Sequence, residues 1–140
     1  MTGDDRTVPA LQALVEDICS ADDVAALTAL WGRAEPSDAR PDGIRVVCPA
    51  DCPFQALEIR PWSEDVTGVV DVELRVDGPR PGWAAVRERF GPFRELPRLH
   101  PSAPQYGALA AAPDRQADAY LIVTVDNDTI AAVTVRRDPR

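Results

Sequence analysis

Two cysteines four residues apart are the first candidates for chemistry in this sequence. Residues 48–53 read CPADCP, so Cys48 and Cys52 each precede a proline. A structural zinc site takes four ligands, and only Cys19 and His100 remain, both isolated in the sequence. A redox pair is typically Cys-x-x-Cys at the start of a helix, which this segment lacks. Proline and aspartate favour turns, so we interpret CPADCP as a turn, with metal binding or a disulfide as the alternatives.

The single histidine, His100, is the other candidate for catalysis near neutral pH. Nothing near it in the sequence supplies a nucleophile or an orienting partner. The sequence has no lysine, which excludes Schiff-base and P-loop chemistry, and it lacks motifs such as GxSxG and HExxH. We therefore predict no catalytic residue and no cofactor. The alternative is a small enzyme or ligand-binding protein of bacterial specialised metabolism, with His100 and Tyr106 at a pocket near residues 92–118.

The charge balance indicates a protein partner rather than a nucleic acid or a membrane. The 140 residues carry 15 basic and 23 acidic side chains, a net charge of −8. Nucleic-acid binding needs clustered positive charge, and no stretch approaches the ~20 apolar residues of a membrane span. The sequence starts with neither a basic leader nor an apolar run, so we expect a cytoplasmic protein. A basic protein partner suits the acidic field, because complementary charges speed association.

The elements that must position these side chains form a single domain, residues 1–140, whose first half has helices followed by strands. Apolar residues at helical spacing predict helices at 9–19 and 24–31. The polar, proline-bearing segment 33–42 is typical of a loop. Short β-branched or alternating runs predict strands at 44–47, 55–60 and 69–76.

The alternating strands predict one polar sheet face. Every second side chain of a strand points to the same side, so the charged residues there share a face. These residues are Glu58, Arg60, Asp71, Glu73 and Arg75. Trp62 follows the second of these strands and could be exposed, which makes it a further contact candidate. We predict that these side chains bind a partner protein; the alternative is a solvated sheet face.

The second half repeats the pattern of the first. WAAVRERFG at 83–91 predicts a short helix and matches VAALTALWG at 24–32 in apolar, aromatic and glycine positions. Alternating residues on both sides of Asn127 and Asp128 predict a hairpin with a tight turn. The irregular stretch 92–118 leaves room for a strand at 93–96 and a helical turn near Leu109.

These patterns predict an α+β fold with two tandem repeats, residues 20–78 and 79–140, after the N-terminal helix 9–19. Each repeat is a helix followed by antiparallel strands, and together the strands form one sheet with the helices packed on one face.

The tandem halves, each with a helix that ends in Trp-Gly or Phe-Gly, resemble the β-lactamase inhibitory proteins. They also resemble the small outer-membrane assembly lipoproteins, which have a single such repeat. The resemblance implies a concave sheet that grips another protein. We therefore predict a non-enzymatic binding module, such as a cytoplasmic inhibitor or immunity protein with an acidic docking surface. A subunit of a larger assembly is a further alternative.

Overall fold

The protein is an α+β domain in which three helices accompany one antiparallel sheet. The computed structural model describes residues 6–21, 23–38, 41–63, 65–78, 80–91, 93–96, 105–111 and 119–138; of 94–96 and 105–111 it describes the backbone. The helices in this part of the chain are α1 (Thr7–Ser20), α2 (Val24–Trp31) and α3 (Trp83–Phe90). The strands are β1 (Arg33–Pro36), β2 (Ile44–Val47), β3 (Phe54–Arg60), β4 (Gly68–Leu74), β5 (Arg94–Leu96), β6 (Gln105–Ala111), β7 (Ala119–Asp126) and β8 (Thr129–Arg137).

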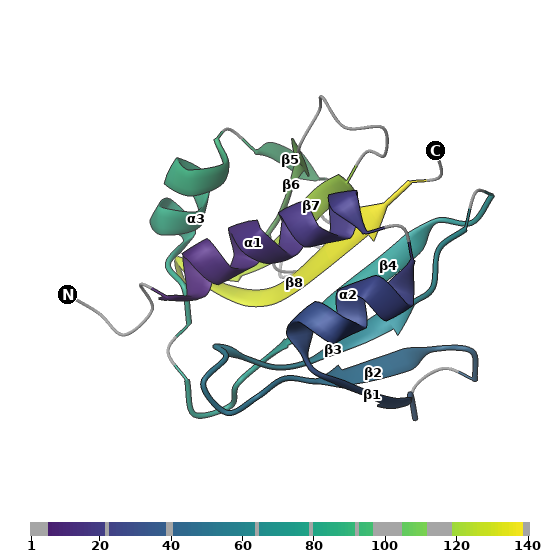
Figure 1. The fold of residues 1–140 in the computed structure, drawn as a ribbon. Coiled ribbons are helices and arrows are strands. Elements are labelled where there is room, and N and C mark those ends of the chain that lie inside the picture. The colour runs from purple at the N-terminus through teal and green to yellow at the C-terminus, as the bar shows by residue number, and fades with distance from the viewer. Residues whose placement is uncertain are drawn as a thin grey trace.

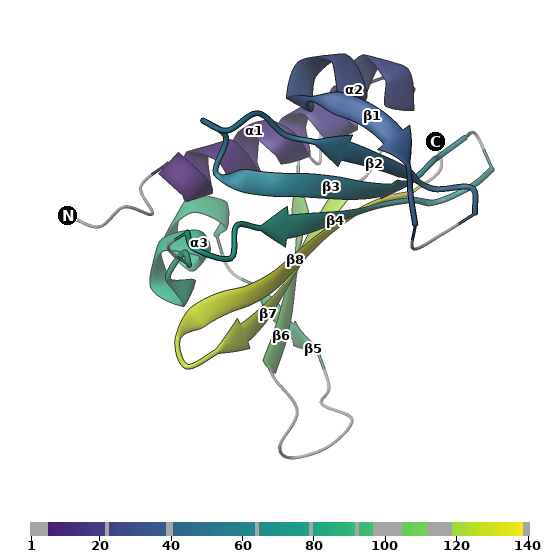
Figure 2. The ribbon, with the colours of Figure 1, turned by 90° about the horizontal axis from the view of Figure 1, so that it is seen from below.

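The sheet consists of two four-stranded meanders joined edge to edge. Its strand order is β1-β2-β3-β4-β8-β7-β6-β5, so the last strands of the two meanders, β4 and β8, pair at its centre. Figure 2 shows that β5–β8 run steeply across the direction of β1–β4. This rotation follows the twist that all extended strands prefer.

A single core lies between the sheet and α1 and α2. Figure 1 and Figure 2 place these two helices on the same side of the sheet. Three side chains of α1 at helical spacing, Leu11, Leu14 and Ile18, are 0% exposed. They belong to one apolar cluster with inward-facing residues of the central strands, among them Leu57 and Val135. The alternation of apolar and polar residues in the sequence therefore matches the alternation of buried and more exposed side chains in the sheet.

The two short helices end in similar ways. The backbone N–H of Gly32 donates to Thr28 O, and that of Gly91 donates to Arg87 O. Gly91 has a φ of 86°, a left-handed conformation that glycine adopts without a Cβ clash. Gly32 is needed for space instead, since a Cβ there would lie 2.1 Å from Val47 O.

Three sequence predictions about local structure are wrong. The segment 33–42 contains the strand β1, which the sequence does not signal because all four of its side chains are exposed. Leu109 lies in β6 rather than in a helical turn, because β6 pairs with β7 along its whole length. The strand predicted at 69–76 ends at Leu74, and Val76 is 87% exposed. The strand expected at 93–96 is confirmed as β5, and the hairpin turn has the positive φ values expected at Asn127 and Asp128.

The two halves share an order of elements, a helix and then four antiparallel strands. The matched aromatic residues Trp31 and Phe90 both pack against the core, although each is half-buried rather than buried. Whether residues 20–78 superpose on 79–140 stays a prediction.

Candidate functional site

The candidate site lies on the outer face of the sheet, defined here as the face opposite α1 and α2. Strand register aligns its side chains in a row across four strands: Arg45 is paired with Glu58, Glu58 with Asp71, and Asp71 with Thr134. Paired residues on neighbouring strands point to the same side. Glu58 and Asp71, predicted from the sequence to share a face, are therefore direct neighbours.

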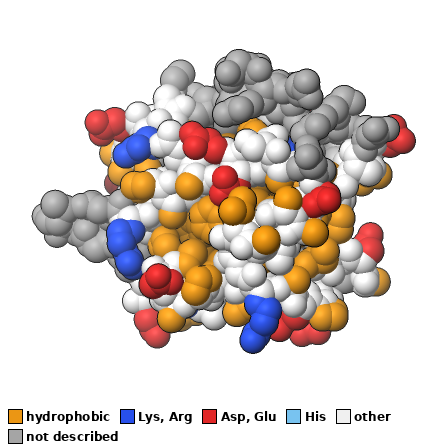
Figure 3. Space-filling view, in the orientation of Figure 1, with side chains coloured by type: hydrophobic (Ala, Val, Ile, Leu, Met, Phe, Trp, Pro, Cys, Tyr) orange, Lys and Arg blue, Asp and Glu red, His pale blue; other side chains and the backbone are white. Residues whose placement is uncertain are grey.

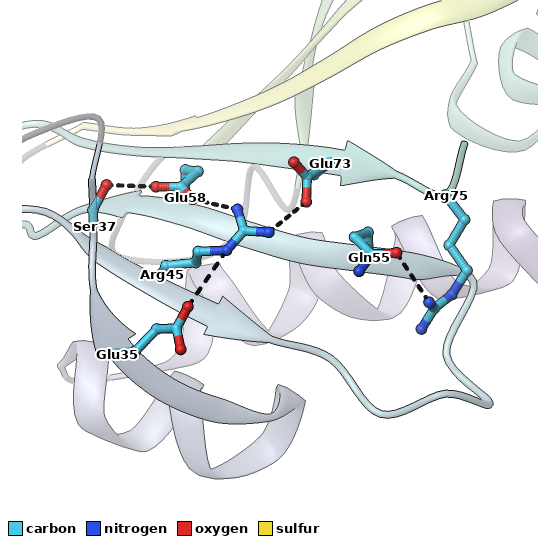
Figure 4. Close-up of polar contacts among 7 residues, drawn as sticks. All are labelled: Glu35, Ser37, Arg45, Gln55, Glu58, Glu73 and Arg75. Carbon is cyan, nitrogen blue, oxygen red and sulfur yellow. Dashed lines mark hydrogen bonds and ion pairs between the residues drawn. The ribbon is translucent and has the colours of Figure 1, made fainter. Parts of the chain in front are cut away.

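An ion cluster forms around Arg45, which none of the sequence patterns singled out. Arg45 Nη1 lies 2.6 Å from Glu58 Oε2, and Nη2 lies 2.7 Å from Glu73 Oε2. On the other side, Nε lies 3.7 Å from Glu35 Oε1. Figure 4 shows the guanidinium between the three carboxylates, which come from β1, β3 and β4. A planar guanidinium with several donors suits such multiple pairing.

Two hydroxyl groups fix the orientation of the acids. Ser37 Oγ donates to Glu58 Oε1 at 2.6 Å, so each oxygen of the Glu58 carboxylate accepts a hydrogen bond. Thr134 Oγ1 donates to Asp71 Oδ1 at 2.7 Å. These bonds hold the carboxylates in place before any partner arrives.

The cluster remains acidic after internal pairing, since one guanidinium faces three carboxylates. Glu73 and Glu58 raise the pKa of Arg45 above its usual value through hydrogen bonds, so Arg45 keeps its charge. The Glu35 and Glu73 side chains are each 45% exposed, whereas that of Glu58 is 21% exposed. Glu35 and Glu73 are therefore the carboxylates of the cluster that are most open to solvent.

Three residues predicted to bind a partner lie outside the ion cluster. Arg75 lies at the far end of the strands, where Figure 4 shows its bond to Gln55. Its guanidinium also donates to Cys52 O and Pro49 O in the turn at residues 48–53. Trp62 is half-buried rather than exposed, under the guanidinium of Arg137 at 4.9 Å from the ring centroid. The buried indole N–H of Trp62 has no hydrogen-bond partner among the described residues. Arg60 is exposed at the end of β3, beyond the cluster.

The residues predicted for the alternative enzyme are not brought together in the part of the chain that the structure describes. His100 lies outside the described residues. The backbone of Tyr106 pairs with Thr124 in β6, and its side chain is not among those described. Among the described residues, no group of three or more His, Cys, Asp and Glu side chains could hold a metal ion.

A second surface lies on the face that carries the helices. Figure 3 shows hydrophobic side chains over the middle of this face, with acidic side chains around them. The solvent side of α2 consists of Ala25, Ala26, Ala29 and Leu30, and Leu30 is 67% exposed. This apolar surface is the alternative to the ion cluster as a candidate docking site.

Sequence reasoning missed four residues of the site: Glu35, Ser37, Arg45 and Thr134. Glu35 and Ser37 belong to the segment predicted as a loop, and Arg45 is the single charge in a short apolar strand. Arg45 does alternate with Ile44 and Val46, so its outward direction could have been found. Its three carboxylate partners could not be found in this way, because they depend on which strands pair.

Comparisons with known proteins found nothing similar to this chain. No protein-family model matches it, and searches of curated proteins and of solved structures also found no match. Among the helices of the described residues, none is long and apolar enough to cross a membrane.

Proposed function

We propose that this protein is a non-enzymatic binding module that docks a basic partner protein on the outer face of its sheet. The observation that carries the proposal is the ion cluster at Arg45, where carboxylates from three strands converge. The net charge of −8 acts in the same direction over a longer range. Complementary charge accelerates encounter and selects among partners more than it adds affinity.

The cluster is suited to docking because its geometry is set in advance. Its side chains are held by hydrogen bonds to Ser37 and Arg45, so a partner has less conformational entropy to remove when it binds. A cationic side chain of the partner would meet Glu35 and Glu73, the two most exposed acids. An inhibitor or immunity protein that neutralises a basic target is the class we infer, in line with the resemblance to β-lactamase inhibitory proteins. The symmetrical order of the two halves supports that resemblance.

The proposal is tested by reversing the charges of the two most exposed acids of the cluster. Glu35→Arg and Glu73→Arg change the surface that a partner meets. Each also removes an ion pair with Arg45, so the free energy of unfolding is measured beside binding to separate a binding defect from a folding defect. Glu58 is left intact, since it is the least exposed of the three acids and bonds to both Ser37 and Arg45. Glu88→Arg is the matched control, because Glu88 is exposed on α3 and its reversal changes the net charge equally.

We expect affinity capture with the wild-type protein and Glu88→Arg to retain the same basic protein, and Glu35→Arg and Glu73→Arg to lose it. With the purified partner, each cluster reversal should cost about 2 kcal/mol of binding or more, with the free energy of unfolding lowered by about 1 kcal/mol or less, as for other exposed ion pairs. Association should also slow and become less sensitive to salt.

Leu30→Arg on α2 separates this proposal from its competitor. If Leu30→Arg abolishes capture while both cluster reversals bind normally, the docking surface is the apolar side of α2 and the proposal is wrong. A captured partner whose binding none of these variants weakens would also contradict it.

A further inference from the structure

The turn between β2 and β3 holds two cysteines in one tight loop. Cys48 N donates to Gln55 O at 3.2 Å, and Cys52 N donates to Pro49 O at 3.0 Å, which closes the loop. The pKa values of Cys48 and Cys52 depend on each other, with an interaction between the two side chains as the largest cause of both shifts. The turn predicted for CPADCP is confirmed, and it also forms a sulfur pair.

Positive charge and hydrogen-bond donors surround the Cys52 side of this pair. Arg75 Nε donates to Cys52 O and Arg75 Nη2 donates to Pro49 O, both at 2.7 Å, so the guanidinium is held against the loop. The backbone N–H of Phe54 donates to Cys52 Sγ at 3.5 Å. A thiolate at Cys52 would therefore have a cation and two hydrogen-bond donors nearby.

The pKa values of the two thiols move in opposite directions. The hydrogen bond from Cys48 is the largest cause that lowers the pKa of Cys52 to about 6, and Arg75 and the Phe54 N–H lower it further. Burial and Asp51 oppose this shift in the Cys52 pKa. The same hydrogen bond, with burial, raises the pKa of Cys48 far above its usual value, while Arg75 and Arg45 lower it slightly. Because the two pKa values move in opposite directions, the Cys52 thiol ionises before the Cys48 thiol.

The two sulfurs also differ in access to solvent. Cys52 is half-buried, whereas Cys48 is 6% exposed. Cys19 lies in α1 and is 3% exposed, so it does not compete for a reagent in solution. Low pKa, partial exposure and a second thiol in the same loop are the features of cysteines that react with oxidants.

We propose that Cys48 and Cys52 form a peroxide-reactive dithiol, in which Cys52 attacks a hydroperoxide and Cys48 converts the product to an intramolecular disulfide. This inference is independent of the docking function. A Cys48–Cys52 disulfide is one of the alternatives to a plain turn that the sequence left open.

The reaction balances in two steps. The Cys52 thiolate attacks one peroxide oxygen, the O–O bond breaks, and the other oxygen takes a proton from solvent and leaves as water or an alcohol. Cys52 is then a sulfenic acid. The Cys48 sulfur attacks the Cys52 sulfur, the S–O bond breaks, and the Cys48 proton leaves with the hydroxyl group as water. Two electrons pass from the two sulfurs to the peroxide, and a thiol reductant would return them.

The experiment exposes the reduced full-length protein to stoichiometric hydrogen peroxide and follows intact mass, free thiols and linked peptides. The wild type and the matched control Cys19→Ser should each lose two thiols and gain a Cys48–Cys52 disulfide. Cys48→Ser should stop at a Cys52 sulfenic acid that dimedone traps. Cys52→Ser should not be oxidised at Cys48.

Arg75→Gln tests the positioning role of Arg75 through a pH profile. In the wild type, the rate of Cys52 alkylation should rise with a midpoint near pH 6. In Arg75→Gln this midpoint should move up toward 9.0, the ordinary value, and an unmoved midpoint would contradict the role given to Arg75.

The proposal itself is overturned if peroxide oxidises the three cysteines equally slowly. It is also overturned if the wild type forms only disulfides between molecules, or if Cys52 proceeds to sulfinic acid while Cys48 stays reduced.

Discussion

At the scale of single residues, three arginines of this acidic chain hold separate segments together through hydrogen bonds and ion pairs. Arg45 sits between carboxylates, Arg75 binds carbonyl groups of the CPADCP turn, and Arg137 binds carbonyl groups at the end of α1. A guanidinium donates several hydrogen bonds in one plane and keeps its charge. An ammonium group has no such planar set of donors. Each of these three arginines joins segments that are far apart in the sequence.

The sulfur pair predicts a peak in the pH dependence of stability. The folded pKa of Cys52 is lowered from 9.0 to about 6, so its contribution to stability is present above pH 9 and is lost as the pH falls through 6. The folded pKa of Cys48 is raised, so its contribution is present below pH 9 and is lost as the pH rises further. Between pH 6 and 9 the folded pair holds one proton and the unfolded pair two, so stability rises with pH. Above 9 it falls.

This prediction is checked under reducing conditions against the double variant Cys48→Ser with Cys52→Ser. The free energy of unfolding, measured with urea across this pH range, should show a difference between the two proteins that peaks near pH 9. A difference that is flat, or that falls steadily from pH 6, would contradict the opposite shifts of the two thiol pKa values.

At the scale of elements, the contact between β8 and the end of α1 fixes the helix over the sheet. Arg137 is 3% exposed, and its Nη1 donates to the carbonyl oxygens of Ile18 and Ala21. The last carbonyls of a helix lack partners within the helix, and a cation there also suits the helix dipole. The neighbouring residue Arg136 is exposed on the other face, where its Nε lies 3.1 Å from Asp138 Oδ1. Arg137 therefore makes a buried contact with α1, whereas its neighbour Arg136 makes a contact on the surface.

Replacing these two arginines separates a buried contact from a surface contact. Arg137→Gln should lower the free energy of unfolding by about 2 kcal/mol, because it leaves buried carbonyl groups without a charged donor. Arg136→Gln, the matched control, should change it by no more than ~0.5 kcal/mol, as is usual for an exposed ion pair. Urea unfolding at neutral pH gives both values. Equal losses for the two variants would show that Arg137 does not anchor α1.

At the scale of the whole molecule, the two meanders form one body. β4 pairs with β8 at five positions, and the buried apolar residues of both halves belong to a single cluster. α1 adds to this unity, since it contacts β7, β8 and α3 while its buried residues join the same cluster. Neither half has a core of its own, so we expect them to unfold together.

Tryptophan fluorescence can test this cooperativity, because each half of the chain contains at least one tryptophan. Trp31 reports on the first half, where it stacks on Phe54, and Trp83 reports on the second, where its ring lies 4.9 Å from that of Phe93. Variants that keep only Trp31 or only Trp83 should each show a single urea transition whose fluorescence and circular dichroism midpoints coincide. A fluorescence midpoint well separated from the circular dichroism midpoint in either variant would show that the halves unfold independently.

The sequence by itself determined the elements whose side chains alternate or repeat at helical spacing. Those are α1, α2, α3, β3, β4 and the β7–β8 hairpin, because burial of one face leaves a period in the sequence. β1 and β6 left no such signal. β1 is short and fully exposed, and β6 is rich in small residues and pairs with β7 at seven positions.

Only the tertiary structure decided the candidate site and the sulfur pair's surroundings. The polar faces of β3 and β4 could be predicted, but the centre of their ion cluster, Arg45, comes from β2. Cys52 could be identified, but Arg75 lies 23 residues further along the chain. Asp71 and Thr134 are 63 residues apart. Such contacts follow from strand order and register, which depend on how the whole core closes and leave no local period in the sequence.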